Sequence, residues 1–259
     1  MSELEKKTSS PPLWLRAMGG DEPPSYFVIA GENYNHVKTF KHDFFAVTAL
    51  YQGSDSQVVL KIGRIATLLG LPMQWCGRFL AGHEARLYAI AQGIEGIPRL
   101  VGMYGTTGFV HEFVPGRPLT KDDRLDDDFF PRLERIIDQV HALDAAYVDL
   151  EKRENVLRGD DGRPHLIDFQ ISYHLPENRG GNSQLARFVL KMLQQSDKYH
   201  LYKHWRRLRP DQLTEAQAAE AIPIWIRLHR AIFRPITLMR RQILVWLGAR
   251  SSIRVRSPG

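Results

Sequence analysis

The chain divides at Val114–Pro118, the most turn-prone stretch of its interior, with the sequence Val-Pro-Gly-Arg-Pro. Before this stretch, residues 26–62 are rich in β-branched and aromatic residues, as strands are. Residues 73–92 then place apolar side chains at the i, i+3 and i+4 spacing of a helix. Beyond the stretch, residues 126–143 form an amphipathic pattern, and the chain from Ser183 onward is helical in character. The sequence therefore predicts an α+β fold with two lobes, a small antiparallel sheet followed by mainly helical structure.

This division predicts four segments along the chain. Residues 1–24 are polar and proline-rich, apart from a short apolar patch at Leu13–Met18, and predict a mostly flexible arm. Residues 25–114 form the expected first lobe, and residues 115–200 form the core of the second. Residues 201–259 form a basic helical region that belongs to the second lobe.

Turn residues predict the short connections within each lobe. Gly53–Ser56 and Gly105–Thr107 each separate two apolar runs, as the loop of a β-hairpin does. In the second lobe, short strands are expected at Tyr147–Asp149, Val156–Leu157 and Leu166–Phe169.

The composition narrows the class of protein. Hydrophobic residues make up 43% of the 259 residues, an ordinary share for a globular protein. The single cysteine, Cys76, excludes an internal disulfide framework and a Cys-x-x-Cys zinc site, which favours a cytoplasmic location. The polar N-terminus lacks the apolar segment of a secretory signal, and no stretch approaches the ~18 uncharged apolar residues of a membrane span. We therefore expect a soluble or surface-bound protein.

Polar side chains with the chemistry of phosphoryl transfer gather in residues 140–172. Asp149 is suited to orient an acceptor hydroxyl and to take its proton. Asn155 and Asp168 offer an amide and a carboxylate oxygen, the hard ligands that Mg²⁺ prefers. An enzyme of this kind also needs a lysine that holds the phosphates of ATP and a glutamate that holds the lysine.

This segment resembles the catalytic and metal-binding loops of the protein-kinase-like superfamily, which carry the pattern HRDxxxxN followed by DFG. Asp149-Leu150, Asn155-Val156-Leu157 and Ile167-Asp168-Phe169 fall in the order of the family, and His141 precedes them as a helix-ending histidine does. The resemblance implies a protein-kinase-like fold, ATP and Mg²⁺ as cofactors, and Asp149 as the catalytic residue. It further implies that Asn155 and Asp168 are the metal ligands.

The first lobe carries a resemblance of its own. Val58–Ile62 resembles the strand with the VAIK motif, which implies that Lys61 holds the phosphates of ATP. Glu84, in the helix that follows, resembles the glutamate that is the partner of this lysine. The segment that includes Glu112 and Val114 and is followed by Pro-Gly resembles the hinge between the lobes, whose backbone binds adenine.

Several positions depart from the family pattern. Tyr147 and Val148 replace the histidine and arginine of HRD, so control by phosphorylation of an activation loop is not expected. Asp149 and Asn155 are six positions apart, one more than in HRDxxxxN, so the catalytic loop must bulge. Gln170 replaces the glycine of DFG and makes this loop stiffer.

A glycine-rich loop is also missing from the sequence. Its place is taken by Phe40–Val47, where Lys41 is a candidate phosphate contact in place of backbone amides. A shortened activation segment and a degenerate glycine loop are familiar in the RIO-like, aminoglycoside-phosphotransferase-like and lipopolysaccharide-core (Kdo) kinases. The chain is similar to that compact branch rather than to regulated protein kinases.

The function implied by the resemblance is transfer of the γ-phosphate of MgATP to an acceptor hydroxyl, on a protein serine or threonine or on a glycan of the lipopolysaccharide type. The alternative is a pseudokinase, a catalytically weak or inactive nucleotide-binding or membrane-surface scaffold, which the missing glycine loop and Gln170 favour. We favour the enzyme, because Lys61, Asp149, Asn155 and Asp168 are all present.

Positive charge is concentrated in residues 201–259, where twelve Lys and Arg stand against three Asp and Glu. Residues 198–209 and 222–250 mix arginines with large apolar side chains, and Pro235 interrupts the second stretch. Three interpretations remain open: helices of the second lobe with a solvated basic face, attachment to an anionic membrane surface, and binding to nucleic acid. Nucleic acid is disfavoured because no recognised binding module is present. Attachment would hold the protein at the inner face of a membrane and favour a glycolipid acceptor.

Overall fold

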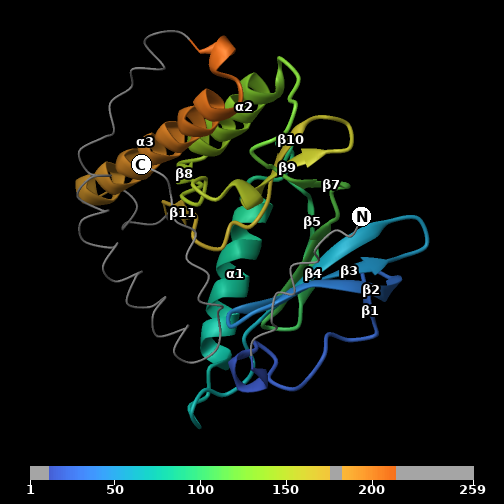
Figure 1. The fold of residues 1–259 in the computed structure, drawn as a ribbon. Helices are drawn as coiled ribbons and strands as arrows, with labels where there is room; N and C mark the ends of the chain where they lie inside the picture. The colour runs from blue at the N-terminus through green and yellow to red at the C-terminus, as the bar shows by residue number, and fades with distance from the viewer. Residues whose placement is uncertain (1–11, 176–182, 214–259) are drawn as a thin grey trace.

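The computed structural model describes residues 12–175 and 183–213. In this part of the chain, the first lobe is a six-stranded sheet with one helix against it, and the second lobe contains two long helices and several short strands (Figure 1). The prediction of an α+β fold with two lobes is confirmed.

The strands of the first lobe lie in the order β1-β2-β3-β4-β6-β5, and all neighbouring pairs are antiparallel. They are β1 (Tyr26–Ile29), β2 (Glu32–His42), β3 (Ala46–Gln52), β4 (Gln57–Gly63), β5 (Leu100–Tyr104) and β6 (Gly108–Glu112). The predicted hairpin loops at Gly53–Ser56 and Gly105–Thr107 join β3 to β4 and β5 to β6. The apolar patterning of the sequence therefore located this sheet correctly.

Helix α1 (Gln74–Ile90) packs against β4, β5 and β6 and follows the predicted helical segment closely. Its approach to β4 depends on two glycines, Gly63 and Gly77. A Cβ atom on Gly77 would lie 2.2 Å from the carbonyl oxygen of Arg64, and one on Gly63 would lie 2.8 Å from the carbonyl oxygen of Gly77. The close contact brings the side chains of Lys61 on the strand and Glu84 on the helix together about two turns further along α1.

The second lobe is built on α2 (Phe129–Ala142) and α3 (Gln184–Leu208), which lie side by side (Figure 1). The apolar face predicted for the first of these helices is buried, and Ser183 caps α3 by accepting a hydrogen bond from the amide of Ala186 at 3.1 Å. One apolar cluster runs from α1 through α2 to Trp205 on α3 and therefore spans both lobes.

Short elements complete the second lobe. They are β7 (Gly116–Pro118), β8 (Ala145–Ala146), β9 (Val156–Gly159), β10 (Pro164–Leu166), β11 (Tyr173–His174) and the 3₁₀ turns η2 (Arg153–Asn155) and η3 (Pro210–Gln212). Strands β10, β9 and β7 form one small sheet in that order, and β11 pairs with β8. The connection between the lobes is thus short, because β7 already takes up the end of the predicted linker.

The strand predicted at Tyr147–Asp149 is wrong. Strand β8 ends at Ala146, and the backbone amides of Tyr147 and Val148 donate to the carboxylate of Asp197 at 2.8 Å each instead of to a neighbouring strand. Val148 also has a positive φ of 71°. A buried carboxylate on a distant helix thus ends the strand, and local sequence did not reveal this.

The structure describes residues 12–24 of the predicted arm, which include its apolar patch at Leu13–Met18. The 3₁₀ turn η1 (Leu13–Leu15) packs against the first lobe, with Leu15 and Ala17 buried. The amide of Ala17 donates to the carbonyl of Asp43 at 2.7 Å, and the carbonyl of Ala17 accepts from Ile65 and Ala66. Residues 1–11 lie outside the described residues.

A buried arginine holds this N-terminal segment in place. The Arg64 side chain is 1% exposed, and its guanidinium donates only to backbone carbonyls within the described residues. These carbonyls belong to three separate segments: Trp14, Leu15 and Arg16; Phe44; and Ala66 and Thr67. The planar guanidinium satisfies acceptors that no apolar residue at this position could satisfy.

The first basic stretch, residues 198–209, lies largely in α3, and both of its lysines are paired. Lys198 contacts Glu134 at 3.1 Å and Asp138 at 2.7 Å, while Lys203 contacts Glu151 at 3.4 Å. These contacts favour the interpretation of residues 198–209 as a helix of the second lobe. The second stretch, residues 222–250, lies outside the described residues. No helix within 12–175 and 183–213 is both long enough and apolar enough to cross a bilayer.

We expect Arg64→Leu to lower the free energy of unfolding by roughly 3 kcal/mol, because several buried carbonyls would lose their donor. Arg64→Lys should recover only part of this loss, since an ammonium cannot reach acceptors on all three segments. Urea denaturation measures both variants. Arg78→Leu is the control, because Arg78 is exposed and bonds only Gln74 within the described residues; a loss of equal size there would contradict the role of Arg64.

Candidate functional site

A buried lysine joins the two lobes. Lys61 on β4 contacts the carboxylate of Glu84 on α1, with its Nζ at 2.8 Å from Oε1 and 2.7 Å from Oε2. The same Nζ lies 2.8 Å from Oδ1 of Asp168, which follows β10 in the second lobe. Lys61, Glu84 and Asp168 therefore form one cluster, although Lys61 and Asp168 are 107 positions apart in the sequence. It brings two carboxyl groups to one ammonium. Burial raises the pKa of Glu84 to about 7, so Asp168 is the carboxyl of the cluster that is fully ionised at neutral pH.

The pKa values follow from this geometry. Burial alone would lower the pKa of Lys61, but Glu84 and Asp168 outweigh it and raise that pKa. Burial would likewise raise the pKa of Asp168, but Lys61 outweighs it and holds the pKa of this carboxyl below its ordinary value. Lys61 and Asp168 are therefore both charged at neutral pH.

Three aromatic rings in edge-to-face contact connect the lobes beside this cluster. The ring of Phe169 lies 4.9 Å from that of Tyr88 on α1 and 5.1 Å from that of Tyr147. The hydroxyl of Tyr88 accepts a hydrogen bond from the amide of Asp168 at 3.1 Å, which supports Asp168 at its positive φ of 64°. Sequence analysis missed Tyr88. Its position four residues after Glu84 places both on one face of α1, and this spacing was the available signal.

The catalytic loop brings Asp149 and Asn155 together. The side-chain nitrogen Nδ2 of Asn155 donates to Oδ2 of Asp149 at 2.9 Å. The extra residue of the loop is taken up by the 3₁₀ turn η2, so the predicted bulge does not separate the two side chains. Lys152, which sequence analysis missed, contacts the same Oδ2 at 2.6 Å. Burial raises the pKa of Asp149 above its ordinary value, and Lys152 and Asn155 oppose that rise.

Asp197 on α3 anchors the start of the catalytic loop. Besides the amides of Tyr147 and Val148, its carboxylate contacts Nε2 of His141 at 3.0 Å. The Asp197 side chain is fully buried, and the β-branched Val148 occupies a left-handed conformation that such residues rarely adopt. Three donors on one carboxylate therefore offset local backbone strain.

The residues proposed as metal ligands fit a hard cation in their chemistry. Within the described residues, the side chain of Asn155 donates through its nitrogen to Asp149, which leaves its Oδ1 to accept. Asp168 uses Oδ1 for Lys61 and retains Oδ2. An amide and a carboxylate oxygen suit Mg²⁺, which keeps several water ligands. No group of three or more His, Cys, Asp or Glu side chains gathers as a metal site in the described part of the chain.

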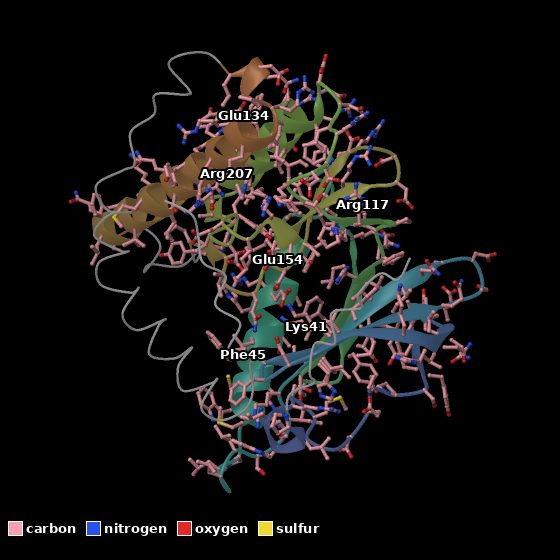
Figure 2. All side chains as sticks on the ribbon, viewed as in Figure 1. Lys41, Phe45, Arg117, Glu134, Glu154 and Arg207 are labelled. Carbon is pink, nitrogen blue, oxygen red and sulfur yellow. The ribbon has the colours of Figure 1, made fainter. Side chains whose placement is uncertain are left out.

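The remaining predicted contacts lie at the rim of the first lobe. Glu112 ends β6; its carbonyl accepts from Nδ1 of His111 at 2.8 Å, and its carboxylate pairs with Arg99. Val114 lies in the connection between the lobes, half-buried. Lys41, near the end of β2, is paired with Asp43 at 2.6 Å (Figure 2). None of these three contacts the Lys61 cluster directly.

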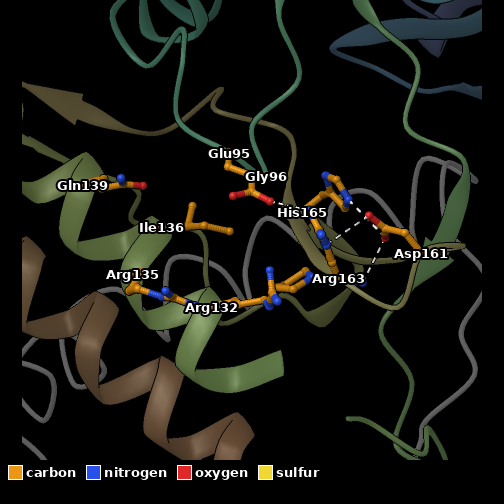
Figure 3. Close-up of a pocket in the computed structure, with 10 residues that line it drawn as sticks. Glu95, Gly96, Arg132, Arg135, Ile136, Gln139, Asp161, Arg163 and His165 are labelled. Atoms are coloured by element: carbon orange, nitrogen blue, oxygen red, sulfur yellow. Dashed lines mark hydrogen bonds and ion pairs between the residues drawn. The ribbon is translucent and has the colours of Figure 1, made fainter. Parts of the chain in front are cut away.

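A cavity of about 190 Å³ lies on another side of the molecule, between α2, the β9–β10 turn and the loop before β5 (Figure 3). Several of its charged groups pair with one another: Arg163 contacts Glu95 and Asp161, and His165 contacts Asp161. Arg132 and Arg135 also line the cavity, and Arg132 pairs with Asp128 outside it. The cavity contains neither Asp149 nor Lys61 and is separate from the candidate active site.

Comparison with known proteins bears on the fold. No protein-family model and no curated protein matches the sequence. Among solved structures, the crystal structure of the Rio2 kinase–ADP/Mg²⁺–phosphoaspartate complex from Chaetomium thermophilum is similar, with a TM-score of 0.50 and 14% identity. The fold is protein-kinase-like. The match covers 69% of this chain and 56% of that one, so the chain spans a little over half the length of the Rio2 structure. At this identity the likeness concerns the kinase-like fold alone.

We expect Asp197→Asn to destabilise the protein by about 2–4 kcal/mol, because an amide NH₂ would face backbone donors in a buried site. Hydrogen exchange at the amides of Tyr147 and Val148 should accelerate in the same variant. Urea denaturation and exchange measured by mass spectrometry check both results. Asp138→Asn on α2, an exposed partner of Lys198, is the matched control; unchanged exchange in Asp197→Asn would contradict the anchoring role.

We expect the carboxyl of Asp149 to titrate above 3.8, the ordinary pKa of an aspartate, because burial penalises its charged form. Lys152→Ala should raise this pKa further, since it removes the cation that opposes the shift. The ionised form would then be lost at a higher pH as the solution is acidified. Carbon-13 NMR titration of the Asp149 carboxyl measures the change, with the exposed Lys121→Ala as control. A lower pKa in Lys152→Ala would contradict the assigned contact.

Proposed function

We propose that the protein is an ATP-dependent phosphotransferase that moves the γ-phosphate of MgATP to an acceptor hydroxyl. The observation that carries the proposal is the pairing of Lys61 with Glu84 and Asp168 across the two lobes, together with the contact between Asn155 and Asp149. These are the charged and polar groups that phosphoryl transfer requires.

In this proposal each residue has one task. Lys61, kept charged and oriented by Glu84, donates to oxygens of the ATP phosphates. Asp149 orients the acceptor hydroxyl and takes its proton as the new O–P bond forms and the bond to ADP breaks. Asn155 and Asp168 would hold Mg²⁺, which neutralises the charge of the phosphates. The backbone of Glu112 and Val114 would bind adenine, and Lys41 is the candidate for an outer phosphate contact.

Lys152 adds a second cation beside the reacting groups. Its Nζ lies 2.6 Å from Asp149, and its charge contributes to the low pKa of Asp168. In the proposed reaction, Lys152 keeps Asp149 ionised before the proton is transferred. It is thus a positioning residue, since its contact is to the proposed base.

The acceptor that we favour is a glycan or lipopolysaccharide-type hydroxyl rather than a protein serine or threonine. Only residues 169–183 separate Asp168 from α3, which leaves little chain to form a platform for an extended peptide. The proposal includes a cytoplasmic protein held at the inner face of a membrane through the basic residues of 201–259, since this charge suits anionic headgroups.

A carboxylate is a second acceptor to be tested. The similar Rio2 structure is described as a complex with ADP, Mg²⁺ and phosphoaspartate. In this chain, Asp149 and Asp168 are the carboxylates beside Lys61 and Lys152. An acyl phosphate is cleaved by hydroxylamine, whereas a phosphate ester is stable to it, so the two products are distinguishable.

We expect Asp149→Asn to reduce phosphoryl transfer by at least about 10²-fold while leaving ATP binding within a few-fold of the wild type, because the amide cannot take a proton. Incubation with γ-labelled ATP and protein, lipid and carbohydrate fractions measures transfer, and calorimetry with Mg²⁺ and ATP measures binding. Asp160→Asn, in the exposed turn after β9, is the control.

The outcomes separate the enzyme from the pseudokinase. Transfer by the wild type that Asp149→Asn abolishes supports the proposal, and hydroxylamine treatment then identifies the acceptor as a hydroxyl or a carboxylate. Binding of MgATP without transfer to any fraction would favour the pseudokinase. Undiminished transfer by Asp149→Asn would overturn the role of Asp149.

A further inference from the structure

A tight turn before α1 holds an exposed leucine in an unfavourable backbone conformation. Leu68 and Leu71 exchange two backbone hydrogen bonds of 2.9 Å, which leaves Leu69 and Gly70 at the tip with φ angles of 51° and 80°. A left-handed conformation suits glycine or asparagine at such a tip and costs a leucine of order 1–3 kcal/mol. The Leu69 side chain is nevertheless 89% exposed. Packing within the described chain therefore does not explain a leucine here.

Other large apolar side chains are exposed on the segments next to this turn and on η1. Leu71 is 65% exposed, Trp75 65% and Phe79 68%, and Trp75 and Phe79 share one side of α1 because they are four residues apart. Leu13 and Trp14, on η1, are also exposed. We call the six residues Leu13, Trp14, Leu69, Leu71, Trp75 and Phe79 the apolar cap. Exposed apolar patches of this kind mark interaction surfaces.

Arg64 holds the segments of the apolar cap together. Its guanidinium donates to the carbonyls of Trp14 and Thr67 at 3.2 Å each and to that of Ala66 at 3.1 Å, so η1 and the turn before α1 share one buried donor. Figure 1 shows η1 and the start of α1 at the end of the molecule that lies away from α2 and α3. The cap is thus a rigid surface at the tip of the first lobe.

The segments that supply the apolar cap are basic. Residues 12–20 and 56–83, which supply the whole cap, contain no Asp or Glu. Of their basic residues, Lys61 and Arg64 are largely buried and Arg16 pairs with Glu22 at 3.6 Å, while Arg78 is exposed on the first turns of α1. Leucines at a loop tip, tryptophans beside them and an exposed arginine match the interface of an anionic membrane, where tryptophan lies at headgroup depth.

We propose that the apolar cap docks the protein onto an anionic lipid surface. Leu69 and Leu71 enter the acyl region, Trp14 and Trp75 lie among the headgroups, and Arg78 contacts lipid phosphates. The proposal uses described residues distant in sequence from 201–259, and it does not depend on phosphoryl transfer.

Docking at this surface has a consequence for the candidate active site. Arg64 also donates to the carbonyl of Phe44 at 3.0 Å, and Ala17 donates to that of Asp43, so the cap is bonded to the turn between β2 and β3. That turn follows Lys41 at the rim of the first lobe. A docked cap therefore holds this rim close to the membrane, where a lipid-linked acceptor would be.

The test places a probe at the tip of the turn. In the full chain, Cys76→Ser removes the single cysteine and Leu69→Cys provides a site for an environment-sensitive fluorophore. We expect its emission to shift to the blue with phosphatidylcholine vesicles that contain phosphatidylglycerol, and nitroxide-labelled acyl chains in these vesicles should quench it. Pure phosphatidylcholine vesicles should bind at least about tenfold more weakly, because each basic residue near an anionic surface contributes to binding.

Substitutions in the otherwise native chain supply the matched comparison. Leu69→Asp and Trp75→Gln should each weaken sedimentation with anionic vesicles by about tenfold, the loss expected from withdrawing one large apolar side chain from lipid. Leu185→Asp, at a leucine on α3 that is 72% exposed, should leave it unchanged.

Three results would overturn the proposal. In the first, the protein sediments with vesicles but the probe at position 69 is not quenched, so another surface makes the attachment. In the second, the probe is already shielded without vesicles, so residues 214–259 or a second copy cover the cap. In the third, Leu69→Asp and Leu185→Asp sediment alike.

Discussion

The relation between the two lobes depends on one buried ammonium group, that of Lys61. Its side chain is 12% exposed, and it reaches a carboxylate of each lobe, Glu84 and Asp168. Opening the lobes would part Lys61 from Asp168 and leave Glu84 as its partner, so the contact with Asp168 favours the closed arrangement of the lobes. The edge-to-face contacts of Phe169 with Tyr88 and Tyr147 add apolar contact at the same place. Charge pairing and aromatic packing thus fix the same arrangement, and the position of Asp168 follows from both.

The catalytic loop depends in turn on a residue far along the chain. Val148 takes a backbone conformation that its own side chain disfavours. The loop keeps this conformation because the carboxylate of Asp197 accepts hydrogen bonds from the backbone amides of Tyr147 and Val148. Burial raises the pKa of Asp197, and its contacts with His141 and the two amides oppose that rise. Because α3 carries Asp197 and also packs along α2, the geometry around Asp149 is tied to the core of the second lobe.

How much of this was available from the sequence differs from feature to feature. The apolar patterns of β4, α1 and α2 predicted these elements, and the order of Lys61, Glu84, Asp149, Asn155 and Asp168 predicted which side chains would share the space between the lobes. The strand at Tyr147–Asp149 was wrong, because the carboxylate that ends it comes from α3. The packing of the apolar patch in the N-terminal arm was not predicted, because the donors that hold it include Arg64, an arginine with no local sign of burial. Lys152 was missed, since a charged residue beside a candidate site carries no pattern of its own. Tyr88 was missed although its spacing from Glu84 was the available signal.

The turn between β2 and β3 takes the place of the glycine-rich loop that the sequence lacks. Asp43 Oδ1 accepts from the amides of Phe45 at 2.8 Å and Ala46 at 3.0 Å, and Phe44 is held through its carbonyl by Arg64. A glycine-rich loop offers free backbone amides to phosphate, whereas here these two amides are already satisfied by a carboxylate. Lys41 is paired with the same carboxylate, so its charge at the turn is offset. An anion between the lobes is therefore met mainly by Lys61 and Lys152, which lie on opposite lobes and are each bound to an aspartate of the candidate site. Two amides of the turn are thus unavailable to an anion, and the candidate site instead carries positive charge on the loop that contains Lys152.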